Sequence, residues 1–263
     1  MEARPDEVVP LLRVQRISVR FGGITALSDL SFDVGEREIR GIIGPNGAGK
    51  TTLFNCLSRF YTPTEGEMFF DGQALGGLPR WRMATLGIGR TFQNLALFPQ
   101  MSVRQNIGIG GHRLMRSGFI AGALQLRSVR KENAELAAEA DRLMDLLDLR
   151  GSADTAVKDL PFGTQKRVEL GRALASRPRL LLLDEPAAGL NHGEVETLIN
   201  LLLDIRERFS LSVLLVEHHM NMVMRVSDRV VALDFGRKIA DDLPALVQQN
   251  PEVIRAYLGA QAS

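Results

Sequence analysis

The clearest chemical signal in the chain is a glycine-rich run that follows an apolar segment. It reads Gly44-Pro45-Asn46-Gly47-Ala48-Gly49-Lys50-Thr51, with Thr52 next, and fits the pattern G-x-x-x-x-G-K-[ST]. Glycines let backbone N–H groups converge on an anion, and the helix expected after the run adds a favourable dipole. Lys50 offers a positive charge to the β- and γ-phosphates, and the Thr51 hydroxyl offers a ligand to Mg²⁺. The run therefore predicts a site for a nucleoside triphosphate with Mg²⁺.

A second signal is a pair of carboxylates at the end of a leucine run. Residues 180–183 are all Leu, as expected of a parallel strand covered on both faces, and Asp184 and Glu185 follow directly. Ligands of α/β sheets bind at the carboxyl ends of the strands. Asp184 suits Mg²⁺, directly or through water, and Glu185 suits the polarisation of an attacking water. The pair complements the phosphate site and predicts hydrolysis.

The spacing of apolar residues predicts the elements that position these two runs. Strands are expected at residues 11–18, 29–34, 38–43, 68–70, 180–183, 212–216 and 229–233, and helices at 50–59, 134–148, 166–175 and 194–208. The alternation of strand and helix after residue 180 indicates an α/β sheet with helices on its faces. The glycines at 108, 110 and 111 are expected to form a simple turn.

Composition excludes several classes of protein. Hydrophobic residues make up 45% and charged residues 24% of the 263 residues, which rules out a disordered tail or a collagen-like fibre. We expect no membrane span, because no apolar run reaches about 18 residues, and no secretory signal, because the start lacks an apolar core. The single cysteine, Cys56, favours a reducing cytoplasm. A net charge of +1 gives no indication of a nucleic-acid partner.

Charge is nevertheless unevenly distributed along the chain. Between Asp71 and Glu132 there are nine Lys and Arg residues and no acidic one, so the remainder of the chain carries −8. The simpler interpretation is a solvated basic face. The alternative is a surface that lies near anionic lipid or an acidic partner.

With residues 44–52 and 180–185 in place, the chain resembles, nearly end to end, the ATP-binding subunit of an ABC transporter. The resemblance implies an α/β P-loop NTPase core of the ABC ATPase type, with an N-terminal antiparallel β region and an inserted α-helical subdomain. It implies a single domain over 1–263. Its parts are a core at about 8–93 and 166–240, the helical subdomain at about 94–165 and a helical tail at 241–263.

The resemblance also assigns roles to single residues. It implies that Phe21 stacks on adenine, and that Gln93 is the glutamine that contacts Mg²⁺ and faces the permease. It makes His218 the histidine that hydrogen-bonds the γ-phosphate, and Glu185 the catalytic base. The cofactors implied are ATP and Mg²⁺, with Thr51, Gln93 and Asp184 around the metal.

The segment Leu160-Pro161-Phe162-Gly163-Thr164-Gln165 lies where the family has its signature, Leu-Ser-Gly-Gly-Gln. In the family this segment of one subunit caps the γ-phosphate held by the other subunit. Pro161 replaces the serine and Thr164 the glutamine, while Gly163 keeps a backbone contact possible. The residues Gly189, Leu190 and Asn191 resemble the D-loop, with Asn191 where many members have Asp.

Details of the motifs resemble the larger ATPase subunit of branched-chain amino-acid importers, including the tail Asn250–Gly259. Urea and short-amide importers share much of this pattern. A lipopolysaccharide-export ATPase, or a soluble ABC ATPase that acts on nucleic acid, is the alternative, and a P-loop kinase is disfavoured. The implied partners are a second ATPase subunit, identical or paralogous, membrane permease subunits and, indirectly, a periplasmic solute-binding protein. The implied location is peripheral, on the cytoplasmic face of the inner membrane.

Overall fold

The computed structural model describes residues 9–91, 95–114 and 127–260. Within them, one sheet has the strand order β10-β9-β3-β8-β7-β6. These strands are β3 (Ile39–Ile43), β6 (Ile88–Arg90), β7 (Leu180–Asp184), β8 (Ser212–Val216), β9 (Arg229–Asp234) and β10 (Arg237–Asp242). All neighbours in this sheet pair in parallel except β10, which is antiparallel to β9. The parallel α/β sheet predicted from the sequence is confirmed, and its site edge lies at the carboxyl ends of β3, β7 and β8.

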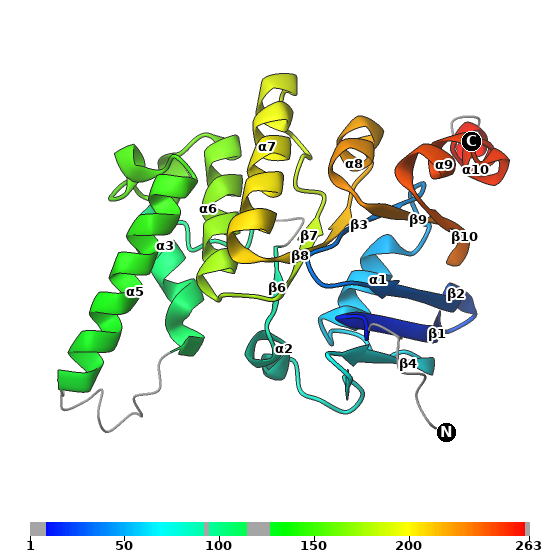
Figure 1. Ribbon diagram of the computed structural model, residues 1–263, viewed down its shortest axis with the longest axis horizontal. Coiled ribbons are helices and arrows are strands. Elements are labelled where there is room, and N and C mark those ends of the chain that lie inside the picture. The colour runs from blue at the N-terminus through cyan, green and yellow to red at the C-terminus, as the bar shows by residue number, and fades with distance from the viewer. Residues whose placement is uncertain (1–8, 92–94, 115–126, 261–263) are drawn as a thin grey trace.

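A second, antiparallel sheet covers one side of the first (Figure 1). Its order is β2-β1-β4-β5, with β1 (Leu12–Phe21), β2 (Ile24–Val34), β4 (Glu65–Phe70) and β5 (Gln73–Ala74). Alternate residues of β7 enter opposite cores. Leu180 and Leu182 join the cluster between the two sheets, whereas Leu181 and Leu183 join the cluster under the helices. A continuous leucine run is therefore what this doubly covered strand requires.

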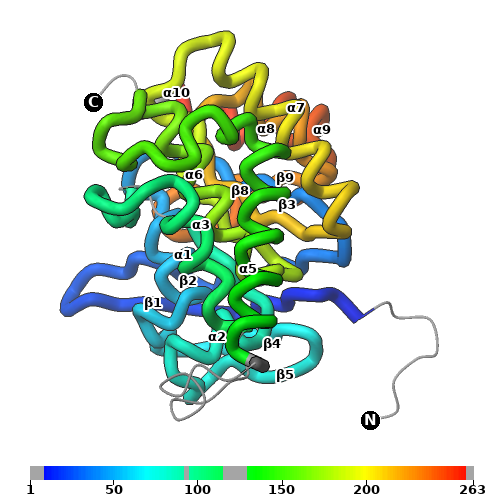
Figure 2. The backbone as a smooth tube through the Cα atoms, turned by 90° about the vertical axis from the view of Figure 1, so that its left-hand side faces the viewer, coloured from blue at the N-terminus to red at the C-terminus, as the bar shows by residue number. Residues whose placement is uncertain are grey.

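The helices occupy both faces and one end of the parallel sheet. They are α1 (Lys50–Leu57), α2 (Trp81–Leu86), α3 (Val103–Gly110), α5 (Arg127–Leu146), α6 (Phe162–Ala175), α7 (His192–Phe209), α8 (Met220–Val226), α9 (Pro244–Gln249) and α10 (Pro251–Ala260), with short 3-10 turns η1 (Gly111–Leu114), η2 (Arg150–Ser152) and η3 (Val157–Asp159). In Figure 1 α3, α5 and α6 form a group at one end of the molecule, and in Figure 2, which views the molecule from that end, they face the reader. Among the described residues, no helix combines the length and the apolar character needed to cross a membrane.

The expected turn at residues 108–111 is wrong. Ser102 begins α3 with a capping box, and the helix runs through Gly110 before η1 starts at Gly111. A Cβ on Gly110 would collide with the backbone oxygen of Arg172, and one on Gly111 would lie 2.6 Å from Leu136 Cδ2. These glycines therefore serve the close approach of α3 to α6 and α5, a requirement that the local sequence does not express.

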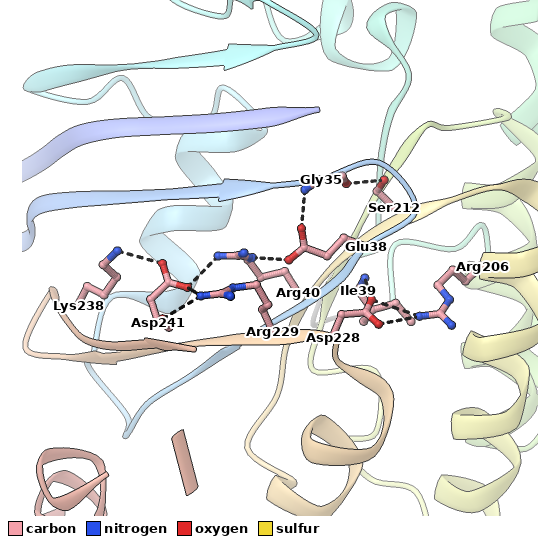
Figure 3. Close-up of polar contacts among 10 residues, drawn as sticks. All are labelled: Gly35, Glu38, Ile39, Arg40, Arg206, Ser212, Asp228, Arg229, Lys238 and Asp241. Carbon is pink, nitrogen blue, oxygen red and sulfur yellow. Dashed lines mark hydrogen bonds and ion pairs between the residues drawn. The ribbon is translucent and has the colours of Figure 1, made fainter. Parts of the chain in front are cut away.

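The amino end of β3 is fixed by a cluster of charged side chains (Figure 3). The buried Arg40 guanidinium donates to Glu38 at 2.7 Å and to Asp241 of β10 at 3.0 Å, and Lys238 donates to Asp241 at 3.0 Å. Asp228 accepts the backbone N–H of Ile39 at 2.8 Å. Because β3 leads directly into the glycine-rich run, these contacts hold the strand that carries the site.

Candidate active site

The loop between β3 and α1 has the backbone of a phosphate cradle. Gly44, Gly47 and Gly49 all have φ in the left-handed region, at 152°, 81° and 99°. A Cβ on Gly44 would collide with the backbone oxygen of Leu233, and a Cβ on Gly49 would lie 2.6 Å from the oxygen of Ala26. Only glycine fits these two positions, and α1 begins at once with Lys50, which places a helix N-terminus at the end of the loop.

Lys50 is folded back onto the loop that precedes it. Its Nζ donates to the backbone oxygens of Gly44 at 2.6 Å and Pro45 at 2.9 Å, and only 7% of the residue is exposed. Burial lowers the pKa of the Lys50 ammonium, while the charges of Glu185 and Asp184 act in the opposite direction. The cradle lysine and the two strand-end carboxylates therefore share one electrostatic environment. The neighbouring Thr51 is exposed and Thr52 half-buried.

Asp184 is held against α1 by an arginine from the neighbouring strand. The Nη2 atom of Arg90 donates to Asp184 Oδ2 at 3.1 Å, and its Nη1 atom donates to Asn55 Oδ1 of α1 at 3.0 Å and to Oγ of Ser58, the C-cap residue of α1, at 2.9 Å. Burial raises the pKa of Asp184 despite the attraction of Arg90. The parallel pairing of β6 with β7 thus positions a buried carboxylate beside the helix that starts with Lys50 and Thr51. Carboxylate and hydroxyl oxygens are the ligands that Mg²⁺ prefers.

Glu185 follows Asp184 in a left-handed backbone conformation, with φ of 48°. Its N–H donates to the oxygen of Val216 on β8 at 2.9 Å, and its own backbone oxygen accepts from Lys166 Nζ at 3.1 Å. The Nδ1 atom of His218 lies 4.0 Å from Glu185 Oε2. The two side chains that the sequence suggested for the reaction therefore meet at the ends of β7 and β8.

Glu217 is a site residue that our sequence reasoning missed. Its side chain is fully buried, Oε1 accepts the N–H of Ala187 at 2.7 Å, and Oε2 accepts the N–H groups of His218 at 2.9 Å and His219 at 3.2 Å. The carboxylate therefore joins the segment after Glu185 to the segment that carries His218. The signal was present, because Val216-Glu217 repeats the pattern of Leu183-Asp184, an apolar strand that ends in an acid.

The segment 160–165 starts α6 and packs on the segment 189–191 of the same chain. Pro161 is the N-cap residue and Phe162 begins the helix, where the missing N–H of the proline leaves no helical bond unmade. Gln165 Nε2 donates to the oxygen of Leu160 at 2.9 Å, and Thr164 is half-buried. A Cβ on Gly163 would lie 2.5 Å from Glu194 Oε1 and 3.4 Å from Leu190.

The turn before α7 completes this contact. Gly189 has φ of 79°, and a Cβ there would lie 2.9 Å from the Phe162 ring. Asn191 is the N-cap of α7 and forms a capping box with Glu194.

The half-exposed Phe21 at the end of β1 makes an edge-to-face contact with Tyr61, with ring centroids 5.1 Å apart. Gln93 lies outside the described residues.

Comparison with known proteins agrees with this arrangement. The ABC transporter family profile matches residues 27–188, and that of the branched-chain amino acid ATP-binding cassette transporter matches residues 237–263. The high-affinity branched-chain amino acid transport ATP-binding proteins BraF of Pseudomonas aeruginosa and LivG of Escherichia coli are each 40% identical to the chain over 250 residues, which covers 95% of this chain and 98% of theirs. The ADP conformation of MJ1267, an ATP-binding cassette of an ABC transporter, is 28% identical, with a TM-score of 0.82 over 95% of this chain and 99% of that chain.

The phosphate cradle, the strand-end carboxylates and these matches lead to one conclusion: the chain belongs to the ATP-binding subunits of ABC transporters, the family that includes the branched-chain amino acid transport ATP-binding proteins.

Proposed function

We propose that this ATPase drives the import of branched-chain amino acids through a membrane permease. The observation that carries the proposal is the meeting of Glu185 and His218 beside the Lys50 cradle, with a 4.0 Å separation between His218 Nδ1 and Glu185 Oε2. The substrate class is supported by the names of the 40% identical relatives and by the tail profile at residues 237–263. The names of these relatives do not support the alternatives, which are import of urea or short amides and export of lipopolysaccharide.

The chain's own residues divide the binding of MgATP among them. The N–H groups of the cradle residues after Pro45 receive the phosphates, Phe21 offers its half-exposed ring to adenine, and Lys50 exchanges its loop carbonyls for phosphate oxygens. Thr51, Asp184 and Gln93 are the residues that would hold Mg²⁺, which neutralises developing phosphate charge when bound. The buried, Arg90-oriented carboxylate of Asp184 fits that use, because its position beside α1 is fixed before any ligand arrives.

Hydrolysis requires one water and two correctly placed side chains. Glu185 polarises the water and receives its proton as the oxygen attacks the γ-phosphorus, and the bond from that phosphorus to the β–γ bridging oxygen breaks, which gives ADP and phosphate. His218 donates to the γ-phosphate oxygens and holds them in place. The segment 160–165 and residues 189–191 act on the nucleotide of a second ATPase subunit, identical or paralogous, so each site is complete only in the dimer.

Closure and opening of that dimer carry the work to the permease. ATP favours the closed state and its hydrolysis products the open state, so the difference in affinity supplies the driving force. Gln93 transmits the movement, and a periplasmic solute-binding protein delivers the amino acid to the permease. The chain is then a peripheral protein on the cytoplasmic face of the inner membrane, and no nucleic acid takes part.

A two-part experiment tests this function. Calorimetry on the isolated chain should detect binding of MgATP, and Lys50→Ala should weaken it strongly; an unchanged affinity would contradict the cradle. Proteoliposomes that contain the chain with its permease and binding protein should take up radiolabelled leucine in an ATP-dependent manner. Uptake of urea in place of leucine would reject the substrate assignment and leave the ATPase assignment intact.

A further inference from the structure

The C-terminal helix α10 reaches the start of the phosphate cradle. The hydroxyl oxygen of Tyr257 accepts the backbone N–H of Gly44 at 2.8 Å, although 213 residues separate the two positions. We propose that α10 is part of the nucleotide site and that Tyr257 is a positioning residue for the cradle. This inference rests on the function proposed above. It assigns a role to the helix α10 of the C-terminal tail, to which that function gives none.

Gly44 connects the tail to the cradle lysine. Its N–H is bound by Tyr257 of α10, and its backbone oxygen is bound by Lys50 Nζ at 2.6 Å. On its other side a Cβ would collide with the oxygen of Leu233 at the end of β9. Gly44 is thus held between a strand and the tail, and the same residue holds the lysine that must move to reach a phosphate.

The tail is anchored well enough to hold Gly44 in place. Val247 of α9 and Val253 of α10 are 1% and 2% exposed and belong to the main hydrophobic core, and Tyr257 packs against the same core. Burial raises the pKa of the Tyr257 hydroxyl, so it stays neutral at physiological pH. A half-buried side chain on an anchored helix loses little entropy when it binds the cradle, since its position is fixed already.

Beyond that hydrogen bond, an open groove separates the helix from the loop. A groove of about 770 Å³ has Pro45–Ala48 on its lining together with Glu252, Arg255 and Ala256 of α10. The hydroxyl of Tyr257 joins α10 to Gly44, and its removal leaves that N–H without this acceptor. By reciprocity, a nucleotide that reorganises the cradle must also change the stability of α10.

The test uses the full-length protein and the variant Tyr257→Phe, which removes only the hydroxyl. We expect MgATP affinity, measured by calorimetry in a Glu185→Gln background, to fall about three- to thirtyfold, the scale of one lost hydrogen bond that leaves a donor unpaired. Steady-state kinetics on the unaltered background should show a raised KM with kcat within about twofold, because the hydroxyl is remote from the reacting atoms. Leu258→Ala, which alters the 62% exposed neighbour, is the matched control and should change neither value.

Hydrogen exchange on the wild-type chain gives a second, independent readout. MgADP should slow amide exchange in residues 251–260, and this arm decides the matter if the variant does not fold. Wild-type affinity in Tyr257→Phe, or unchanged exchange in residues 251–260, would overturn the inference. A wild-type chain that binds no MgATP would instead remove the proposed function, so the two failures are distinguishable.

Discussion

At the scale of single residues, the site depends on the backbone conformation of Glu185 as well as on the types of its side chains. Glu185 adopts φ of 48°, a conformation that non-glycine residues adopt at some cost in energy. Its N–H bond to Val216 and the bond from Lys166 to its oxygen hold that conformation from two different elements. The side chain is thereby directed toward His218 rather than along the strand.

Glu185→Gln tests the role of this carboxylate. The amide keeps the shape of the side chain but cannot accept a proton from water, so ATP turnover should fall about 10²–10⁴-fold, the usual contribution of a general base. The affinity for MgATP should persist, because Glu185 lies beyond the cradle. A coupled-enzyme ATPase assay checks the rate and calorimetry checks the affinity. Turnover near the wild-type value would exclude Glu185 as the base.

Glu217→Gln tests the fully buried carboxylate behind the site. In the wild type, the two carboxylate oxygens of Glu217 accept the backbone N–H groups of Ala187, His218 and His219. In the variant, an NH₂ group replaces one of these oxygens and cannot accept a hydrogen bond, so at least one of the three bonds must break. We expect kcat to fall about tenfold or more, with nucleotide affinity retained. Glu67→Gln, at an exposed carboxylate on β4, is the control. Equal kcat in both variants would mean that Glu217 does not position His218.

At the scale of elements, the contact between the starts of α6 and α7 connects the segment proposed to act on the partner's nucleotide with Glu185 of the same chain. The α6 start, proposed to act on the partner's nucleotide, packs through Phe162 and Gly163 against Gly189 and Glu194. Lys166, one turn further on, donates to the backbone oxygen of Glu185. A displacement of this segment by a docked partner would therefore reach Glu185, the proposed catalytic base of the same chain, which offers a physical route for coupling between the two sites of the proposed dimer.

The start of α7 gives an element-scale prediction. Asn191 accepts the N–H of Glu194 at 3.0 Å, and Glu194 Oε2 accepts the N–H of Asn191 at 2.8 Å. Asn191→Ala removes this cap and should lower the free energy of unfolding by about 1 kcal/mol. Asn191→Asp keeps an acceptor at the same place and should retain the stability. Urea denaturation followed by circular dichroism measures both. An alanine variant as stable as the wild type would mean that this cap contributes nothing.

The sequence predicts what is local in this fold and misses what is not. The cradle, α1 and β7 are predicted because a contiguous run fixes each of them, although α1 ends at Leu57, two residues before the expected Arg59. The bond from Ala187 to Glu217 spans 30 residues and that from Gly44 to Tyr257 spans 213, so no window of sequence contains either pair. The expected turn at Gly110 and Gly111 is wrong for the same reason, because their neighbours Arg172 and Leu136 lie far along the chain.

At the scale of the whole molecule, the described cations of the positive run between residues 72 and 131 do not all lie on one solvated face. Arg90 is buried against Asp184, Arg104 pairs with Asp141, and Arg113 donates to the oxygen of Ser176 at 2.7 Å at the end of α6. Arg90 therefore joins β6 to β7, and Arg104 and Arg113 join parts of the helical group to one another. This distribution removes part of the basis for a continuous lipid-facing surface in that stretch.

The core between the two sheets contains the one cysteine of the chain, and the reaction rate of its thiol measures how often this core opens. Cys56 on α1 is 0% exposed, and burial raises the pKa of its thiol to about 11. At neutral pH the thiolate fraction is then about a hundredfold lower than for a thiol of ordinary pKa near 9. A thiol reagent should therefore modify Cys56 only through openings of the core that α1 shares with β1, β2 and β7.

We predict that nucleotide protects Cys56 although the thiol is not a ligand. MgATP binds the closed core through the cradle at the start of α1, so in the Glu185→Gln variant a concentration of about 100 times Kd should slow modification of Cys56 about a hundredfold. Reaction with a chromogenic disulfide, followed by absorbance, measures the rate, and Cys56→Ala supplies the blank. Raising the pH should accelerate the reaction, because the thiolate attacks and its fraction in the opened core grows as the pH approaches the ordinary thiol pKa near 9. A rate that nucleotide does not change would mean that α1 opens without disturbing the cradle, which contradicts a nucleotide site built on that helix.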